Sequence, residues 1–351
     1  MQLKTLSLFD FRNHREKRFE FGEQNIVFFG NNGKGKTNIL EAISVLSVGK
    51  SWREKQPVDL IRKGESSAKI MGNMEDNAYQ VLIEEKNRTI FRNEKKVSLK
   101  SHIGAISTLL FCPEFLGLFS GNKRERQKFF DRFLFQISPN YRENLTRANQ
   151  AHKQKTRLLR QGFERVVSWD EIHPWNTILS ETVPKVVSER ESFVKDINPI
   201  FQEEFSKISG TSQDSVEIKL ELKEEVSSNQ KSCIEWLETN FNRECAAQKN
   251  FISPLRDDFS FFIRSQPILQ TASRGEERSV LLALLSAKKH FLNHKMGVSP
   301  ILLLDDVFSE LDDNRQKQLE TLCEGSQAFI TTTHQEHFDR FSSPIQKFEI
   351  L

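Results

Sequence analysis

The sequence predicts an α/β fold in which a mixed or parallel sheet with helices is joined to an antiparallel β subdomain and carries an inserted helical second lobe. Three observations support this prediction. The buried-strand pattern of Ile26–Phe29 leads through a glycine-rich loop into helical spacing, and a second apolar strand near residue 300 ends in two acids. Between them lies a charge-rich, proline-poor segment. We therefore divide the chain into 1–121, 122–248 and 249–351.

The bulk composition is that of a soluble globular protein. The 351 residues suggest about two domains, and 37% are apolar, 28% are charged and the mean hydropathy is −0.53. No apolar run approaches the roughly 18 residues of a membrane span, and no signal-like segment begins the chain, so we expect a cytoplasmic protein. Because the net charge is only +3, any nucleic-acid contact must come from a local basic patch.

The N-terminal segment predicts strands that precede and follow a phosphate site. Leu3–Phe9 and Phe19–Phe21 read as strands around a polar turn, in which Arg12 and Asn13 either face a nucleotide or form an ordinary basic turn. Beyond the site, the segment 68–97 alternates apolar and polar residues between asparagines, which indicates antiparallel hairpins.

The loop after Ile26–Phe29 fits the phosphate-loop pattern G-x-x-x-x-G-K-[ST] in its required strand-to-helix context. Glycines let backbone N–H groups converge on phosphate oxygens. Lys36 should reach the β- and γ-phosphates, and Thr37 should hold Mg²⁺. The alternative is a surface turn with a solvated lysine. The predicted binding residues here are Gly30, Asn31, Asn32, Gly33, Lys34, Gly35, Lys36, Thr37 and Asn38.

The inserted segment is expected to be mainly helical, with a break at 169–175. Its basic bias from Lys123 to Arg165 fits either a phosphate backbone or a solvated charged helix face. One strand is expected within 211–228 and a helix over 233–248. A further strand at 257–263 suggests that the chain has by then re-entered the first domain.

The C-terminal segment supplies the second half of the predicted site. Ser273 and Gly275 begin an amphipathic helix whose free amides offer a second anion-binding end, with a plain capped core helix as the alternative. After the strand near residue 300, Asp305 would hold Mg²⁺ and Asp306 could orient or deprotonate the attacking water. The strand at 329–333 ends at His334, whose imidazole could approach a γ-phosphate.

Taken in order, these motifs resemble the ABC-type ATPase heads of SMC-like DNA repair proteins, over nearly the whole chain. The resemblance depends on seven stretches: DFRNH (10–14), GNNGKGKTN (30–38), LFCPEFL (110–116), KRERQKFFD (123–131), SRGEE (273–277), LLLDDVFSELD (302–312) and TTTH (331–334). It implies that 30–37 is Walker A, 273–277 the signature, 302–306 Walker B, 309–312 the D-loop and His334 the switch histidine.

The resemblance also implies a function. Such heads bind ATP and Mg²⁺ and dimerise on ATP, with the signature serine, Ser273 here, closing the partner's site. Members that act in recombinational repair bind double-stranded and gapped DNA, including single-strand/double-strand junctions. They work with RecR and RecO to promote RecA loading, and their ATPase is weak and DNA-stimulated.

The chain departs from the usual family pattern in three places. The signature has Arg274 and Glu276, the residue after the Walker B aspartate is Asp306 where transporters usually have Glu, and only Glu114 stands near a Q-loop position. Two other functions are considered. One is an ATP-switched, chromosome-associated scaffold of the SMC class. The other is a transporter nucleotide-binding subunit, which the long basic insertion disfavours.

Overall fold

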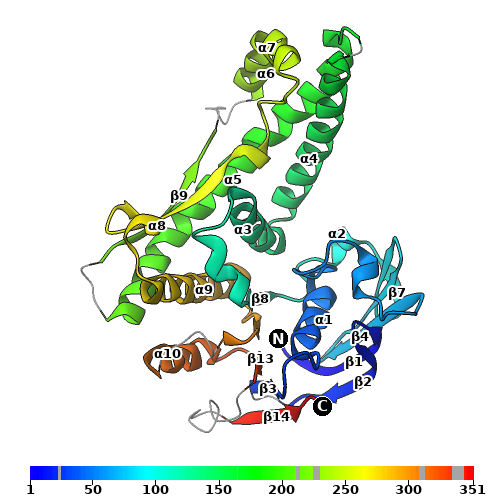
Figure 1. Ribbon diagram of the computed structural model, residues 1–351, viewed down its shortest axis with the longest axis vertical. Coiled ribbons are helices and arrows are strands. Elements are labelled where there is room, and N and C mark those ends of the chain that lie inside the picture. Colours follow the sequence, from blue (N-terminus) through cyan, green and yellow to red (C-terminus); the bar gives the residue numbers. More distant parts are fainter. Residues whose placement is uncertain (23–24, 164, 211–213, 224–229, 308–312, 334–343) are drawn as a thin grey trace. The chain divides into compact units, whose positions relative to one another are not determined.

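The computed structural model describes residues 1–22, 25–163, 165–210, 214–223, 230–307, 313–333 and 344–351 (Figure 1). The chain forms two compact units. The first unit contains Met1–Gly117, Glu204–Thr211 and Ser273–Leu351, and the second contains Leu118–Glu203 and Ser212–Ala272. None of the helices within these described ranges combines the length and hydropathy that a membrane span requires.

A five-stranded parallel sheet forms the centre of the first unit. Its order is β14 (Ile345–Glu349), β3 (Asn25–Phe29), β13 (Ala328–Thr332), β12 (Ile301–Leu304) and β8 (Thr108–Phe111). All residues of β12 and β13 are buried, which explains why both strands are apolar runs rather than alternating ones. The carboxyl ends of β3, β12 and β13 therefore meet at one edge of the sheet.

A six-stranded antiparallel sheet completes the β structure of this unit. Its order is β2 (His14–Glu20), β1 (Leu3–Phe11), β4 (Ser67–Met74), β5 (Ala78–Glu84), β6 (Arg88–Arg92) and β7 (Lys95–Val97). Helix α1 (Lys36–Val48) packs against it (Figure 1), and one apolar core joins the antiparallel sheet, α1 and the parallel strands. The expected hairpins of 68–97 are confirmed.

The helices of the first unit are short except for one. Besides α1, they are α2 (Leu99–His102), α9 (Arg274–Met296) and α10 (Asp313–Cys323), with 3-10 turns η1 (Pro57–Leu60) and η2 (Pro113–Leu118). Helix α9 begins at the predicted cap, because the Ser273 hydroxyl accepts the N–H of Glu276 while the Glu276 carboxylate accepts the N–H of Ser273.

The second unit contains long helices and a small sheet. Its helices are α3 (Lys123–Ile137), α4 (Pro139–Arg160), α5 (Trp169–Ser209, whose last turns belong to the first unit), α6 (Gln230–Thr239), α7 (Phe241–Ala247) and α8 (Ile268–Thr271), with 3-10 turns η3 (Gln161–Phe163) and η4 (Pro254–Arg256). A three-stranded antiparallel sheet has the order β11 (Gln266–Pro267), β10 (Asp258–Ile263) and β9 (Val216–Glu221).

The expected α/β class, with its antiparallel subdomain and helical insertion, is confirmed, but three expectations about elements were wrong. The expected break at 169–175 is the first part of α5, and the expected helix 233–248 is two helices. Strand β10 does not return to the first domain, because it pairs with β9 and belongs to the second unit. The chain passes through the first unit at Glu204–Thr211 and returns to it at Ser273.

Candidate functional site

The loop between β3 and α1 has a backbone that only glycines adopt readily. Gly30, Gly33 and Gly35 have φ values of +138°, +80° and +101°, and Gly35 caps the start of α1. A Cβ on Gly35 would lie 2.5 Å from Asn13 Oδ1, and one on Gly30 would lie 2.5 Å from the carbonyl oxygen of Ile350. The glycines are therefore needed both for the turn and for the close approach of neighbouring segments.

Lys36 curls back into this loop. Its Nζ donates to the carbonyl oxygens of Gly30 (2.7 Å) and Asn31 (2.9 Å), and the residue is buried. Burial lowers the pKa of Lys36, while the nearby carboxylates of Asp306 and Asp305 oppose that shift. The loop thus holds an amine at its centre, where the oxygens of a bound phosphate would replace the two carbonyls as acceptors.

The acids at the end of β12 lie beside the start of α1. Thr37 Oγ1 donates to Asp305 Oδ1 (2.8 Å), and Thr331 Oγ1 donates to the same oxygen (2.6 Å). Burial raises the pKa of Asp305, and the two hydroxyl donors act in the opposite direction. Asp306 has φ +43°, and its N–H donates to Thr331 Oγ1 (2.9 Å). Two segments far apart in sequence therefore meet through direct hydrogen bonds.

A pocket of about 310 Å³ opens over these groups. It is lined by Asn32, Gly33, Gly35, Lys36, Thr37, Asn38, Arg53, Asp306, Thr331 and Thr333. Backbone amides, an amine, a guanidinium and hydroxyls suit a polyphosphate, and the Thr37 hydroxyl beside the Asp305 carboxylate offers the hard oxygen ligands that Mg²⁺ takes. The residues present thus fit both a triphosphate and its magnesium ion.

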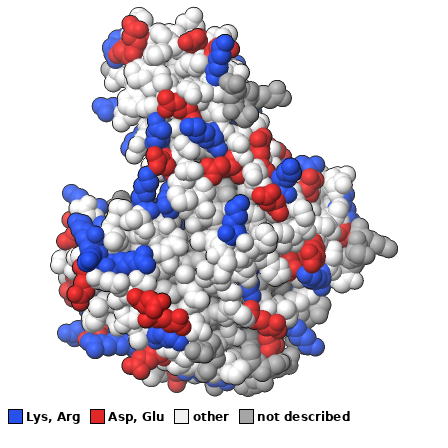
Figure 2. All heavy atoms as spheres, turned by 180° about the vertical axis from the view of Figure 1, so that it is seen from behind, with Lys and Arg blue, Asp and Glu red and all other residues white. Residues whose placement is uncertain are grey.

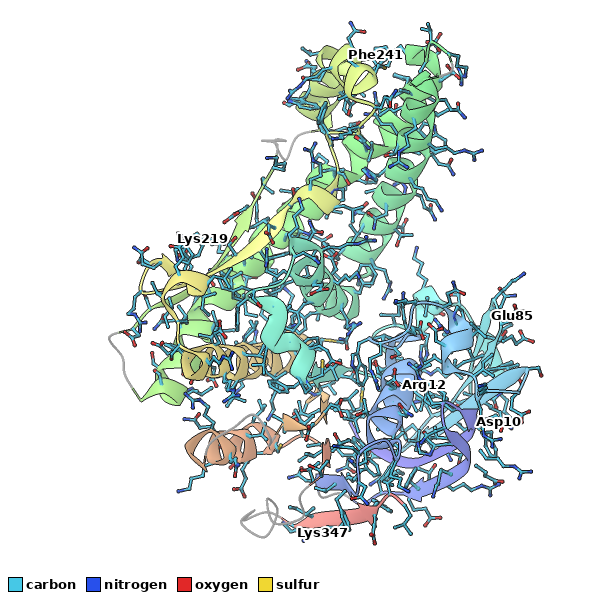
Figure 3. The ribbon with its side chains drawn as sticks, viewed as in Figure 1. Asp10, Arg12, Glu85, Lys219, Phe241 and Lys347 are labelled. Atoms are coloured by element: carbon cyan, nitrogen blue, oxygen red, sulfur yellow. The ribbon has the colours of Figure 1, made fainter. Side chains whose placement is uncertain are left out.

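The turn between β1 and β2 packs against the loop. Asn13 Oδ1 accepts from Asn38 Nδ2 (2.8 Å), and His14 Nε2 lies 3.1 Å from the carbonyl oxygen of Gly35. Arg12, labelled in Figure 3 beside α1, pairs with the buried Glu41 of that helix. Arg12 does not line the described pocket. A nucleotide-binding role for Arg12 and Asn13 stays a prediction.

The signature segment is not part of this chain's own pocket lining. Ser273 is exposed at the start of α9, and a Cβ on Gly275 would lie 3.2 Å from an Arg315 guanidinium nitrogen. Neither residue contributes to the pocket described above. His334 and the expected D-loop, 309–312, lie outside the described residues. Glu114 is exposed in η2, and its charge contributes to raising the pKa of Asp305.

Sequence reasoning missed several groups that the structure places at or beside the pocket. Arg53 and Thr333 line the pocket. The Thr331 hydroxyl donates to Asp305, and Glu41 forms an ion pair with Arg12. Thr331 and Thr333 had a usable signal, because Thr331 lies at the carboxyl end of β13, a parallel strand beside β3, and Thr333 directly follows that strand. Arg53 stands in an irregular segment with no pattern that points to phosphate.

A phosphate loop at β3, joined by hydrogen bonds to the acidic end of β12, defines an ABC-type ATPase head of the SMC kind. The family model described as the RecF/RecN/SMC N terminal domain matches residues 2–349. The SMC head bound to the C-winged helix domain of ScpA is similar in fold, with a TM-score of 0.54 at 15% identity over 96% of this chain and 91% of that one.

Proteins with higher sequence identity show which family within this class the chain resembles. The "DNA replication and repair protein RecF" of Streptococcus gordonii is 34% identical over 100% of this chain and 98% of its own length, and that of Natranaerobius thermophilus is 32% identical over 97% and 93%. A structure described as the recombination mediator protein RecF-ATP in the RecFOR pathway has a TM-score of 0.89 at 26% identity, covering 99% of this chain and 95% of that one. The chain belongs to the RecF family of DNA replication and repair proteins.

Proposed function

We propose that the chain binds MgATP in the pocket at β3, α1 and β12. The observation that carries the proposal is the hydrogen bond from Thr37 to Asp305, which unites the phosphate loop with the acidic strand end. The loop amides and Lys36 would hold the phosphates, and Thr37 and Asp305 would hold Mg²⁺. ATP supplies a phosphoanhydride bond whose hydrolysis resets the protein. The RecF-ATP structure among the relatives supports the same ligand.

In the proposed hydrolysis, Asp306 acts on water. Asp306 directly follows Asp305, the proposed magnesium ligand, and its backbone N–H donates to Thr331 Oγ1. These two constraints set the position from which the Asp306 carboxylate extends. A carboxylate there can orient a water molecule or accept its proton. His334 is proposed to approach the terminal phosphate. Turnover is proposed to be weak and stimulated by DNA.

ATP is proposed to join two copies of this chain. The signature helix α9 presents an exposed Ser273, with backbone amides at its start, outside this chain's own pocket lining. A second copy could receive that end of the helix on its bound triphosphate, since helix N-termini favour anions. Ser273 and Gly275 are therefore proposed to act in the partner's site.

DNA is proposed to contact a basic stripe on α4, formed by Lys153, Arg157 and Arg160. All three are exposed, and spacings of four and three place them on one helix face over about 10 Å. Several other cations of the basic segment are engaged within the protein. The buried Lys155 pairs with Glu244, Arg147 with Glu181 and Arg165 with Glu171, and the buried Arg142 donates to a backbone carbonyl.

The charge pattern elsewhere favours such a local stripe. On the face shown in Figure 2, Lys and Arg are interspersed with Asp and Glu. A mixed surface gives little long-range attraction to DNA, so short-range contacts must supply the affinity. The stripe contains no acid, because the helix has none between residues 144 and 160.

The cellular role is proposed to be recombinational repair and replication restart. The chain would act at gapped DNA and single-strand/double-strand junctions, with RecR and RecO, to promote RecA loading. The names of the relatives and the RecFOR description of the similar structure support this role. We propose a cytoplasmic location, where the DNA of the bacterial relatives lies.

One experiment tests the proposal as a whole. ATP hydrolysis is measured with and without gapped duplex DNA, together with the molar mass of the protein with no nucleotide, ADP and ATP. We expect slow hydrolysis that gapped duplex accelerates, and a doubling of mass with ATP only. No ATP binding would overturn the proposal, whereas ATP binding without DNA stimulation or mass change would remove its DNA and dimer parts.

A further inference from the structure

The residues around Glu41 form a charged network that links three segments to the phosphate pocket. Glu41 is the sixth residue of α1, and its side chain is 0% exposed. Arg12 Nη2 donates to Glu41 Oε1 (2.7 Å), and Arg12 Nε donates to Oε2 (3.1 Å). The geometry is bidentate, the strongest arrangement for an arginine and a carboxylate.

Arg12 is itself fixed by the backbone. Its Nη1 donates to the carbonyl oxygen of Asp59 (2.7 Å), and its N–H donates to that of Leu60 (2.8 Å). The residue has φ +55°, an uncommon conformation that persists where surrounding contacts hold it. Arg12 therefore balances the Glu41 charge from a rigid position.

Arg53 is tied to the same carboxylate in two ways. Its Nη1 lies 3.7 Å from Glu41 Oε2, a looser ion pair than that of Arg12. The Ser51 hydroxyl donates to Glu41 Oε1 (2.5 Å) and accepts the N–H of Arg53 (3.0 Å). Glu41 thus holds the backbone of Arg53 through Ser51 and its guanidinium directly.

The guanidinium of Arg53 remains available to the pocket. Its side chain is 44% exposed and lines the pocket beside Lys36 and Asp306. Its charge also reaches Asp305, whose pKa it lowers against the larger effect of burial. A loose pair to an already balanced carboxylate can be exchanged for a phosphate without leaving Glu41 uncompensated.

We propose that Glu41 is a positioning residue that holds Arg53 at the phosphate pocket, with Arg12 as the fixed counter-charge. In this arrangement Arg53 contacts the bound phosphates, and Glu41 acts through it. The inference rests on the proposed ATP site and adds to it a residue that makes no contact with the ligand.

The test measures ATP affinity by titration with a fluorescent ATP analogue, beside the thermal midpoint without nucleotide. Glu41→Gln should weaken binding about tenfold, as expected when a charged hydrogen-bonded group is withdrawn from the ligand. Arg53→Gln should weaken it to a similar degree. The double variant should bind no more weakly than Arg53→Gln alone, because both changes remove one function.

Glu54→Gln is the matched control. Glu54 belongs to the same segment and forms the same kind of buried pair, with Arg88 Nη2 at 2.6 Å, but it does not line the pocket. This variant should lower the thermal midpoint and leave ATP affinity within about twofold, well inside the tenfold change above. Equal losses in Glu41→Gln and Glu54→Gln would overturn the inference, since loosening of the segment would then explain both.

Two further outcomes would overturn it: wild-type affinity in folded Glu41→Gln, or independent, multiplying effects of Glu41→Gln and Arg53→Gln. If Glu41→Gln does not fold, Glu41→Asp keeps the charge and withdraws it from Arg53. It must then weaken ATP binding, and unchanged affinity would overturn the inference. Failure of the wild-type protein to bind ATP would instead refute the proposed function.

Discussion

At the residue scale, we expect nucleotide affinity to depend most on Lys36. Its amine already donates to two backbone carbonyl oxygens, so the side chain is ordered before ligand binds. A phosphate can replace these acceptors with little further loss of side-chain entropy. We expect Lys36→Ala to weaken ATP binding by about a hundredfold or more, as loss of charge-assisted hydrogen bonds implies.

Equilibrium binding of labelled ATP measures this change. The exposed Lys63, outside the pocket lining, supplies the control Lys63→Ala, which should bind ATP normally. Near-normal affinity in folded Lys36→Ala would contradict the assigned role.

His102 gives the first unit a predictable pH response. Its buried Nε2 lies 2.6 Å from the carbonyl oxygen of Leu46, and burial lowers its pKa from 6.5. The unfolded chain therefore binds a proton at higher pH than the native protein, and stability falls as pH drops through about 6.5.

In His102→Gln the amide can still donate to Leu46 but does not titrate. Its free energy of unfolding, measured by urea denaturation between pH 7.5 and 5.5, should fall less steeply than that of the wild type. The buried His14 and the partly buried His152, whose pKa values are also lowered, and Asp257, whose pKa burial raises to about 6, remain in both proteins and contribute to the slope left over. Parallel curves for the two proteins would contradict this prediction.

At the scale of elements, helix α9 is proposed to act in assembly and not in nucleotide binding by its own chain. Ser273→Arg removes the hydroxyl of a capping box, which costs about 0.5–2 kcal/mol of stability, and adds a bulky cation at the exposed helix start. We expect the variant to bind ATP normally but neither to dimerise nor to hydrolyse it. Molar mass and phosphate release are the measurements.

Ser273→Thr keeps a capping hydroxyl and should retain most activity. Normal turnover by Ser273→Arg would remove the proposal that this residue completes the site of a second copy.

Helix α4 carries the predicted DNA-binding stripe. Replacing Lys153, Arg157 or Arg160 by Gln should reduce the slope of log K against log salt by roughly 0.9 for each DNA phosphate that the protein no longer neutralises. Arg147→Gln is the control, because that cation is paired with Glu181. An unchanged slope in the triple variant would place the DNA elsewhere on the protein.

Local sequence patterns predicted the elements of the first unit well. Ile26–Phe29, Ile301–Leu304 and the capped start at Ser273 were identified because each carries its own signal in consecutive residues. The pairing of β10 with β9 was not predicted. Alternation of apolar and polar residues shows that a strand is half-buried, but it does not show which strand lies beside it.

The sequence patterns also did not predict which side chains pair when the residues lie far apart in the sequence. Lys155 belongs to the basic segment that was interpreted as either a DNA-phosphate surface or a solvated charged helix face, yet it is fully buried against Glu244, which lies on α7. Glu41 and Arg53 lack a motif of their own and acquire their roles only when the strands assemble. The meeting of the phosphate loop with Asp305 was predictable, because parallel strands end at one edge.

For the whole molecule, the central prediction concerns an ATP-held dimer. Asp306→Asn removes the proposed base and keeps the backbone, since asparagine tolerates the positive φ of +43° at this position. The variant should bind ATP, hydrolyse it slowly and accumulate as a dimer.

Sedimentation velocity with ATP and with ADP measures the effect. A variant that stays monomeric with saturating ATP would contradict it, and wild-type turnover would show that Asp306 is not the base.

The position of β3 has a consequence for the order in which the molecule is made. This strand lies between β13 and β14, and the Ile350 N–H donates to the carbonyl oxygen of Phe29, the residue before the glycine loop. The backbone that leads into the loop is therefore held by residues more than 300 positions later in the sequence. A ribosome that has released the first hundred residues has already exposed the loop, but not its neighbours. Nascent chains should therefore gain nucleotide affinity only after β13, β14 and Ile350 have emerged.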